Sequence, residues 1–170
     1  MKVSTILDQI DVGAMALPQF QRGYVWTRDQ VKALMTSLYK RHPVGSLLVW
    51  VTKTENAQAR GDGILQPGSI ELLLDGQQRV TSLYGIVRGN TPKFFEGNAQ
   101  AFTGLYFNIE DQSFEFFMPQ KMKDNPLWVN VSVLMKDGIG KFITPFTSNP
   151  EYSMKVNDYI NRLSRLYDIR

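Results

Sequence analysis

The sequence predicts one domain that mixes helices with short strands. The clearest helix follows Thr27, which forms a capping box with Gln30 ahead of apolar residues at helical spacing. The short apolar runs 46–51 and 70–74 are typical of buried strands, and the aromatic-rich stretch 104–118 predicts a β-hairpin. At 170 residues the chain is long enough to bury one hydrophobic core.

The remaining elements of the first half follow from local signals. Ser4 can cap a short first helix, and residues 13–20 predict a loop and a strand. Residues 52–69 are polar and rich in glycine, which predicts a surface loop. The stretch after residue 74 carries an apolar face at helical spacing, and this helix should stop at Gly89.

The second half predicts a further strand, an irregular region and a last helix. Residues 127–133 alternate as a strand does, and glycines and prolines interrupt residues 138–150. A final helix should begin at Pro150, and its apolar stripe runs to the end of the sequence. We therefore expect a domain over residues 1–150, followed by a helix over 151–170 that leads into a downstream domain.

Composition excludes several kinds of chemistry. The chain has no cysteine, which excludes disulfides, thiolate catalysis and cysteine-ligated metals. The single histidine, His42, argues against a histidine metal site or a catalytic triad. The formal net charge of +3 permits a nucleotide or nucleic-acid partner without requiring one. No apolar run reaches bilayer-spanning length and no signal peptide is visible, so we expect a cytoplasmic protein without a membrane partner.

Residues 75–79, Asp-Gly-Gln-Gln-Arg, lie where the 70–74 strand meets the next helix. A helix N-terminus presents unpaired N–H groups to anions, and Gly76 lets the backbone turn sharply. Gln77, Gln78 and Arg79 add side-chain donors, while Asp75 can hold Mg²⁺ bound to phosphates. The alternative is structural: Asp-Gly is a common turn, and Arg79 can simply pair with Asp75.

A second polar segment precedes the helix that Thr27 caps. Its residues 21–26 read Gln-Arg-Gly-Tyr-Val-Trp, so two helix N-termini and two arginines can converge on one polyphosphate. The alternatives are that Arg22 is a surface cation and that Trp26 belongs to the core. Ser37, on the same helix, is either a ligand contact or a solvated serine.

Four segments in this order resemble the N-terminal domain of GmrSD-type restriction proteins: residues 17–26, 34–37, 43–50 and 74–83. The likeness is strong to about residue 90 and loose beyond it. It implies an α+β fold of the ParB/sulfiredoxin type, in which helices flank a mixed sheet. It also implies binding of a nucleoside triphosphate (NTP) and its hydrolysis, coupled to restriction of modified phage DNA.

The resemblance assigns roles residue by residue. It places the nucleotide phosphates at residues 75–79, with Gln21 and Arg22 in the same pocket and Ser37 at a phosphate-contacting helix position. Asp75 and Arg79 are then the catalytic candidates, and Asp75 meets the magnesium of the bound NTP.

Two departures from related proteins limit this assignment. Sulfiredoxins have a cysteine where Gln77 stands, so sulfur reduction is excluded. Family members usually continue into a helical region and a nuclease domain with histidine-based metal chemistry. DNA cleavage would therefore need a downstream domain or a partner chain, and DNA would be engaged through the full-length protein.

Three functions remain open from the sequence. The first is an NTPase domain that regulates a nuclease in antiphage defence. The second is a ParB-like, nucleotide-gated DNA-binding or sensor module without hydrolysis, which would hold DNA through scattered basic residues: Lys53, Arg60, Lys136 and Lys141. The third is a nuclease acting through the same pocket, for which one aspartate offers few metal ligands.

Overall fold

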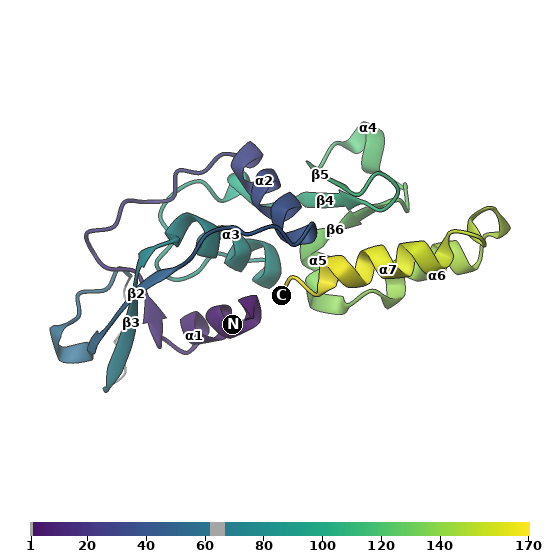
Figure 1. Cartoon of the computed structure of the whole chain (residues 1–170). Helices are drawn as coiled ribbons and strands as arrows, with labels where there is room; N and C mark the ends of the chain where they lie inside the picture. Colours follow the sequence, from purple (N-terminus) through teal and green to yellow (C-terminus); the bar gives the residue numbers. More distant parts are fainter. Residues whose placement is uncertain (1, 62–66) are drawn as a thin grey trace.

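The computed structural model describes residues 2–61 and 67–170, and it confirms the α+β class (Figure 1). The strands are β1 (Met15–Ala16), β2 (Leu48–Lys53), β3 (Ser69–Asp75), β4 (Leu105–Asn108), β5 (Ser113–Phe116) and β6 (Trp128–Asn130). The helices are α1 (Val3–Asp11), α2 (Arg28–Tyr39), α3 (Gln77–Arg88), α4 (Pro119–Met122), α5 (Val131–Asp137), α6 (Gly140–Thr147) and α7 (Val156–Tyr167). Single turns of 3₁₀ helix occur at η1 (Thr54–Asn56), η2 (Ala99–Ala101) and η3 (Pro150–Tyr152).

A mixed three-stranded sheet carries the motif of residues 75–79. Its order is β1-β3-β2, with β1 parallel and β2 antiparallel to the central β3. On one face of β3, Leu73 packs against Val80 of α3, and on the other Leu72 and Ile70 pack against Ala16. Because β3 packs against other residues on both faces, it holds the start of the turn into α3 in a defined position.

The second sheet is antiparallel, in the order β5-β4-β6. β4 and β5 form the predicted hairpin, with Phe107 opposite Phe114. The strand predicted over 127–133 is confirmed only in part, because β6 ends at Asn130. The Asn130 side chain accepts a hydrogen bond from the Val133 backbone N–H at 3.1 Å, and this cap starts α5.

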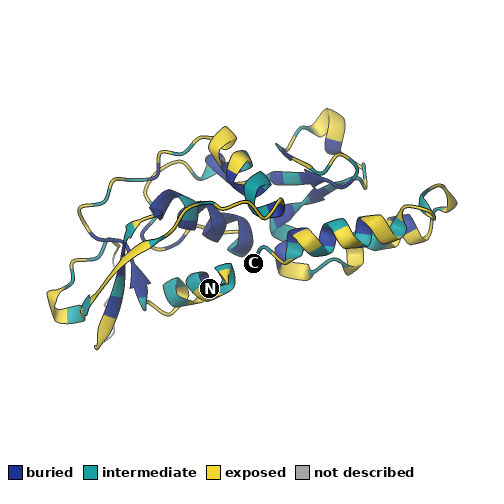
Figure 2. Cartoon of the chain, in the orientation of Figure 1, coloured by how far each residue is buried: buried dark blue, intermediate teal, exposed yellow. Residues whose placement is uncertain are grey.

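Helix α3 lies in the middle of the molecule, between the two sheets (Figure 1). Ten of its twelve residues are buried, and it packs against α1, α2 and α5. Figure 2 shows α3 almost entirely in the colour of buried residues. The helix predicted after residue 74 is therefore confirmed, and the αL residue Gly89 ends it as expected.

The C-terminal helix α7 packs into the same core. Tyr159, Leu163 and Leu166 are at most 1% exposed and belong to the cluster that α2, α3 and the second sheet share. The prediction that this helix begins at Pro150 was wrong, since Pro150 starts the 3₁₀ turn η3 and α7 begins at Val156. The region 138–150, predicted to be irregular, contains α6.

The buried character predicted for the 46–51 strand was also wrong. β2 occupies an edge of its sheet, and Leu48, Trp50 and Val51 are 58%, 49% and 60% exposed. Figure 2 shows this strand mostly in the exposed colour. An apolar run reports strand propensity, whereas its place at a sheet edge is decided by which strands pair.

Smaller predictions had mixed outcomes. The capping box of Thr27 and Gln30 is present as predicted. The Ser4 cap was wrong, because α1 begins one residue earlier and Lys2 occupies the N-cap position. Within the predicted surface loop 52–69, residues 62–66 lie outside the described part. No helix in the described part of the chain combines the length and the apolar character needed to cross a membrane.

Candidate functional site

The junction between β3 and α3 depends on a glycine at its centre. Asp75 ends β3, Gly76 adopts a left-handed conformation with φ +94°, and α3 begins at Gln77. A Cβ at position 76 would lie 2.2 Å from Cδ2 of Leu47. Only glycine permits this turn and this close approach. The α3 N-terminus lies directly after the end of the central strand β3, and no side chain caps it.

An open cavity of about 230 Å³ lies at this N-terminus. Nine residues line it: Gln21, Arg22, Trp26, Leu74, Asp75, Gly76, Gln77, Gln78 and Arg79. The structure thus brings together the predicted residues of the 21–26 segment and of the 75–79 motif. It does not bring Ser37 to this cavity, because Ser37 lies ten residues beyond the N-cap Thr27, about 15 Å along α2.

Gln78 fastens the start of α2 to the start of α3. Its Oε1 accepts hydrogen bonds from the backbone N–H groups of Val25 at 2.9 Å and of Trp26 at 3.3 Å. Its Nε2 donates to the carbonyl of Gly23 at 3.2 Å. The side chain is 8% exposed, so these bonds are made away from solvent. One amide therefore fixes the backbone over residues 23–26.

Two further glutamines complete this attachment. Nε2 of Gln77 donates to the carbonyl of Arg22 at 2.5 Å, and Nε2 of Gln21 donates to the carbonyl of Leu74 at 2.9 Å. The first bond runs from the motif to the 21–26 segment and the second runs back to β3. The cavity wall is therefore rigid, although residues 21–26 have no regular secondary structure.

Two buried hydroxyl groups form a hydrogen-bonded chain to the backbone carbonyl of Gln78. Neither was identified from the sequence as part of the site. Oγ of Ser82 donates to the backbone carbonyl of Gln78 at 2.7 Å. Because that bond uses the serine proton, the hydroxyl of Tyr24 donates to Ser82 Oγ, at 2.7 Å. Burial raises the pKa of Tyr24, which keeps it a donor. The detectable signal was a polar residue, Ser82, four positions after Gln78 on an apolar helix face.

Arg79 makes most of its contacts with the protein itself. It donates from Nη1 to the carbonyl of Val44 at 2.5 Å and from Nη2 to that of Ser46 at 2.8 Å. Nη2 also lies 3.2 Å from Oδ2 of Asp75. The pairing of Arg79 with Asp75, one of the alternatives from sequence, is thus present. Three of the five guanidinium donors hold the loop after α2 and the end of β3.

The donors left for a ligand come from other groups. The Arg22 side chain is exposed and makes no hydrogen bond or ion pair within residues 2–61 and 67–170. The backbone N–H groups of Gln77, Gln78 and Arg79 belong to the first turn of α3, where no intrahelical acceptor exists. One exposed cation and three oriented N–H groups suit an anion.

Asp75 offers a carboxylate to a metal bound by such an anion. Its side chain is 72% exposed at the mouth of the junction. The described residues contain no cluster of three or more acidic or histidine side chains of the kind that holds a metal alone. Magnesium bound to phosphates needs only one or two protein carboxylates, so Asp75 fits that role.

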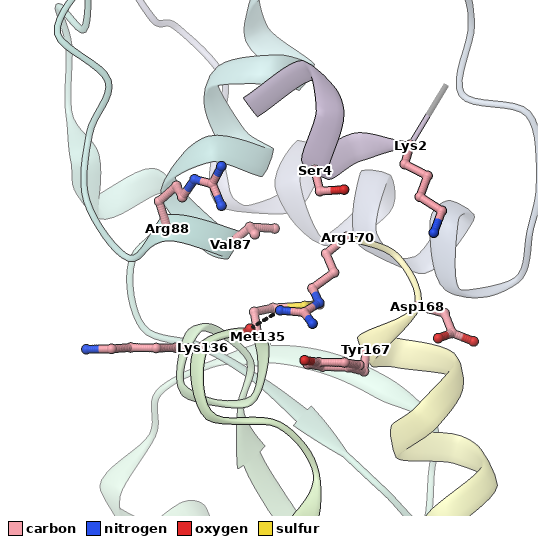
Figure 3. Close-up of a pocket in the computed structure, with 9 residues that line it drawn as sticks. All are labelled: Lys2, Ser4, Val87, Arg88, Met135, Lys136, Tyr167, Asp168 and Arg170. Carbon is pink, nitrogen blue, oxygen red and sulfur yellow. Dashed lines mark hydrogen bonds between the residues drawn. The ribbon is translucent and has the colours of Figure 1, made fainter. Parts of the chain in front are cut away.

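A larger cavity, of about 770 Å³, lies elsewhere, where the ends of α1, α3, α5 and α7 meet (Figure 3). Arg88 lines it but is held by Asp8 and Asp11 at 2.5 and 2.7 Å, and Nη1 of Arg170 donates to the carbonyl of Met135 at 3.1 Å. None of the residues predicted to bind nucleotide lines this cavity.

Three of the four basic residues considered for DNA contact lie beside acidic side chains. Lys53 lies 3.9 Å from Glu55, Lys141 pairs with Asp137, and Arg60 contacts Glu96 at 3.5 Å. Lys136 lines the larger cavity instead. Each of the first three basic side chains therefore has an acidic partner within 4.0 Å.

Fold and site together define an α+β domain in which the helix after the central strand has an uncapped N-terminus that lines a polar cavity. The chain matches the family described as "GmrSD restriction endonuclease, N-terminal domain" over residues 3–167. The chain belongs to this family of restriction-system proteins, and the match extends well beyond residue 90, where the visible resemblance became loose.

A curated relative is similar to part of the chain. An uncharacterized protein of Methanocaldococcus jannaschii is 40% identical over 91 aligned residues. The alignment covers 47% of this chain and 16% of that relative, so the chain spans only a small part of the longer protein.

Proposed function

We propose that this domain binds an NTP with Mg²⁺ at the junction of β3 and α3, hydrolyses it, and thereby regulates restriction of modified DNA. The observation that carries the proposal is the uncapped N-terminus of α3, which opens into a cavity beside Arg22, a side chain with no partner in the described part of the chain. The nuclease activity belongs to a separate domain or a partner chain in this proposal.

The size and donors of the cavity suit the phosphate chain. At about 230 Å³ it is smaller than the roughly 300–1,000 Å³ usual for sites that enclose a whole ligand. The phosphates would meet the N–H groups of residues 77–79 and the positive end of the α3 dipole. The sugar and base must then lie outside this cavity.

The contacts favour a division of labour between the two arginines. Arg22 is free to reach phosphate oxygens and to stabilise charge in the transition state. Arg79, held by Val44 and Ser46, would position the loop and orient Asp75. Asp75 would hold Mg²⁺ or direct the attacking water.

Calorimetric titration of the four NTPs with Mg²⁺ tests binding. We expect Arg22→Ala to weaken binding about tenfold or more, because a hydrogen bond to a charged group is lost, without changing the melting temperature. Arg79→Ala should both weaken binding and lower the melting temperature. Lys121→Ala removes one exposed positive charge from α4 and serves as the control. Equal binding by wild type and Arg22→Ala would contradict the proposed site.

One observation favours a non-hydrolysing switch as the second candidate. Among the described residues that line the cavity, Asp75 is the only one with a carboxylate, and it is paired with Arg79. Phosphate release from bound NTP distinguishes the two functions: steady turnover supports the NTPase, and binding without turnover supports the switch. Nicking of plasmid without NTP would contradict both.

A further inference from the structure

A third cavity, of about 450 Å³, lies beside β3, farther along this strand from α3 than the phosphate cavity. Its lining comes from residues 18–20, from Asn56 and Gln58, and from Trp50 and Leu72 of the sheet. We propose that this cavity receives the nucleobase of the NTP whose phosphates lie at the α3 N-terminus. The proposal rests on the nucleotide-binding function and assigns its base-binding part.

Two aromatic side chains give this cavity a stacking surface. Phe20 is 77% exposed and Trp50 is 49% exposed, although burial of such rings is strongly favourable. Bases stack on exposed aromatic side chains in nucleic-acid and nucleotide sites. An aromatic ligand of base size would cover apolar surface that is now in contact with water.

The polar part of the lining consists of carboxamides. Gln19, Asn56 and Gln58 each carry a donor and an acceptor, and none of the described residues that line the cavity has an ionised side chain. Their side-chain amides make no hydrogen bond among residues 2–61 and 67–170, whereas the backbone N–H of Gln19 donates to the carbonyl of Gln58 at 2.9 Å. A neutral ring with donors and acceptors on its edge, such as a nucleobase, satisfies these groups.

The proposed base cavity and the phosphate cavity both lie along strand β3. Leu72 lines the base cavity and Leu74 the phosphate cavity, and alternate residues of a strand face the same side of the sheet. The segment from Pro18 to Arg22 runs past both cavities, and Gln21 ties it to Leu74. Gly76 lies four positions after Leu72, about 13 Å at strand rise. One extended NTP can span that distance.

The test compares a nucleotide with the phosphate chain alone. Calorimetry with Mg²⁺ measures binding of the preferred NTP and of inorganic tripolyphosphate to wild type, to Phe20→Ala and to Phe117→Ala, an exposed aromatic outside both cavities. We expect Phe20→Ala to weaken NTP binding about tenfold or more and to leave tripolyphosphate binding unchanged. Phe117→Ala should change neither.

Fluorescence gives a second measurement that does not depend on turnover. NTP should quench tryptophan emission, and Trp50→Phe, which keeps an aromatic ring, should remove the part of that quenching that comes from Trp50. Any quenching that remains is assigned to Trp26, which lines the phosphate cavity. Tripolyphosphate should not quench Trp50, since the proposed phosphate site lies at the other end of β3.

The outcomes distinguish failure of the proposed base site from failure of the nucleotide-binding function on which it rests. If wild type binds neither NTP nor tripolyphosphate, the nucleotide-binding function itself fails. If both bind with equal affinity, and Phe20→Ala affects them equally, the phosphate site stands and the base site is overturned. A change of oligomeric state in Trp50→Ala, with NTP affinity intact, would assign the exposed aromatic surface to self-association instead.

Discussion

Arg79 and Gln78 line the cavity, but most of their hydrogen bonds go to backbone groups of the protein. Gln78 holds backbone groups of Val25, Trp26 and Gly23, and Arg79 holds those of Val44 and Ser46. Both side chains are held in place by protein atoms, and the uncapped N–H groups of α3 stay available. The motif thus fixes the walls of the cavity and leaves its ligand donors on the backbone.

Gly76→Ala should destabilise the protein and weaken NTP binding. A left-handed conformation costs a non-glycine residue about 1–3 kcal/mol, and the added Cβ would also clash with Leu47 at 2.2 Å. Urea unfolding measures the loss of stability. Gly89→Ala is the matched control, because Gly89 also has a positive φ but no atom within 4 Å of the added Cβ. Equal losses in the two variants would mean that the contact with Leu47 does not constrain the turn.

At the scale of elements, the attachment of α7 rests on a turn between two strands. Glu110, in the β4–β5 turn, accepts hydrogen bonds from Lys155 Nζ at 2.5 Å and from the hydroxyl of Tyr159 at 2.5 Å. The Arg162 guanidinium donates to the carbonyls of Ile109 and Glu110 at 2.9 and 3.0 Å. The second sheet therefore holds the N-terminal half of α7 by polar contacts as well as by packing.

The stabilisation that Glu110 gives to the fold should be lost at acidic pH. Hydrogen bonds from Lys155 and Tyr159 lower the pKa of this carboxyl from its ordinary value of 4.5. A lowered pKa stabilises the fold above the unfolded value, and that stabilisation is lost as the pH falls through the folded value. Melting temperature measured from pH 7 to pH 3 should therefore show wild type above Glu110→Gln at neutral pH, with the difference shrinking below about pH 4.5.

Glu151→Gln is the control for that pH series, because Glu151 is exposed and makes no side-chain ion pair within the described ranges. A difference between wild type and Glu110→Gln that stayed constant down to pH 3 would show that the carboxylate charge does not hold α7.

At the scale of the whole molecule, the largest hydrophobic cluster connects the second sheet with the helices that pack on it, whereas the buried residues of the first sheet lie in two smaller clusters. The cluster joins buried residues of α1, α2, α3, α5 and α7 with Phe107 and Phe114 of the second sheet. Leu163 of α7 is fully buried in that cluster. The C-terminal helix is therefore integral to the described fold, and the cavity at the α3 N-terminus rests on this common core.

Leu163→Ala should lower the free energy of unfolding by about 2–5 kcal/mol, because it leaves a cavity in the shared core. Urea unfolding followed by circular dichroism should still give one cooperative transition. Leu48→Ala removes the same atoms from a leucine that is 58% exposed on β2 and should cost far less. A separate early transition in Leu163→Ala would show instead that α7 unfolds independently.

Much of the fold followed from patterns confined to short segments. The capping box at Thr27, the hairpin over 104–118 and the strand-to-helix junction at 75–79 were all predicted, because each depends on residues close together in the chain. The grouping of Gln21 and Arg22 with the 75–79 motif was also expected, and the structure places all of them around one cavity.

The sequence by itself determined many of the local elements, the motif and, through that motif, the family, since propensity, caps and turns act between near neighbours. Only the tertiary structure decided that Arg79 binds carbonyls at positions 44 and 46, that Ser37 lies away from the cavity and that β2 is an exposed edge. These facts depend on which segments, tens of residues apart, come to lie side by side. Strand pairing and core packing make that choice cooperatively, so no single segment of the sequence contains it.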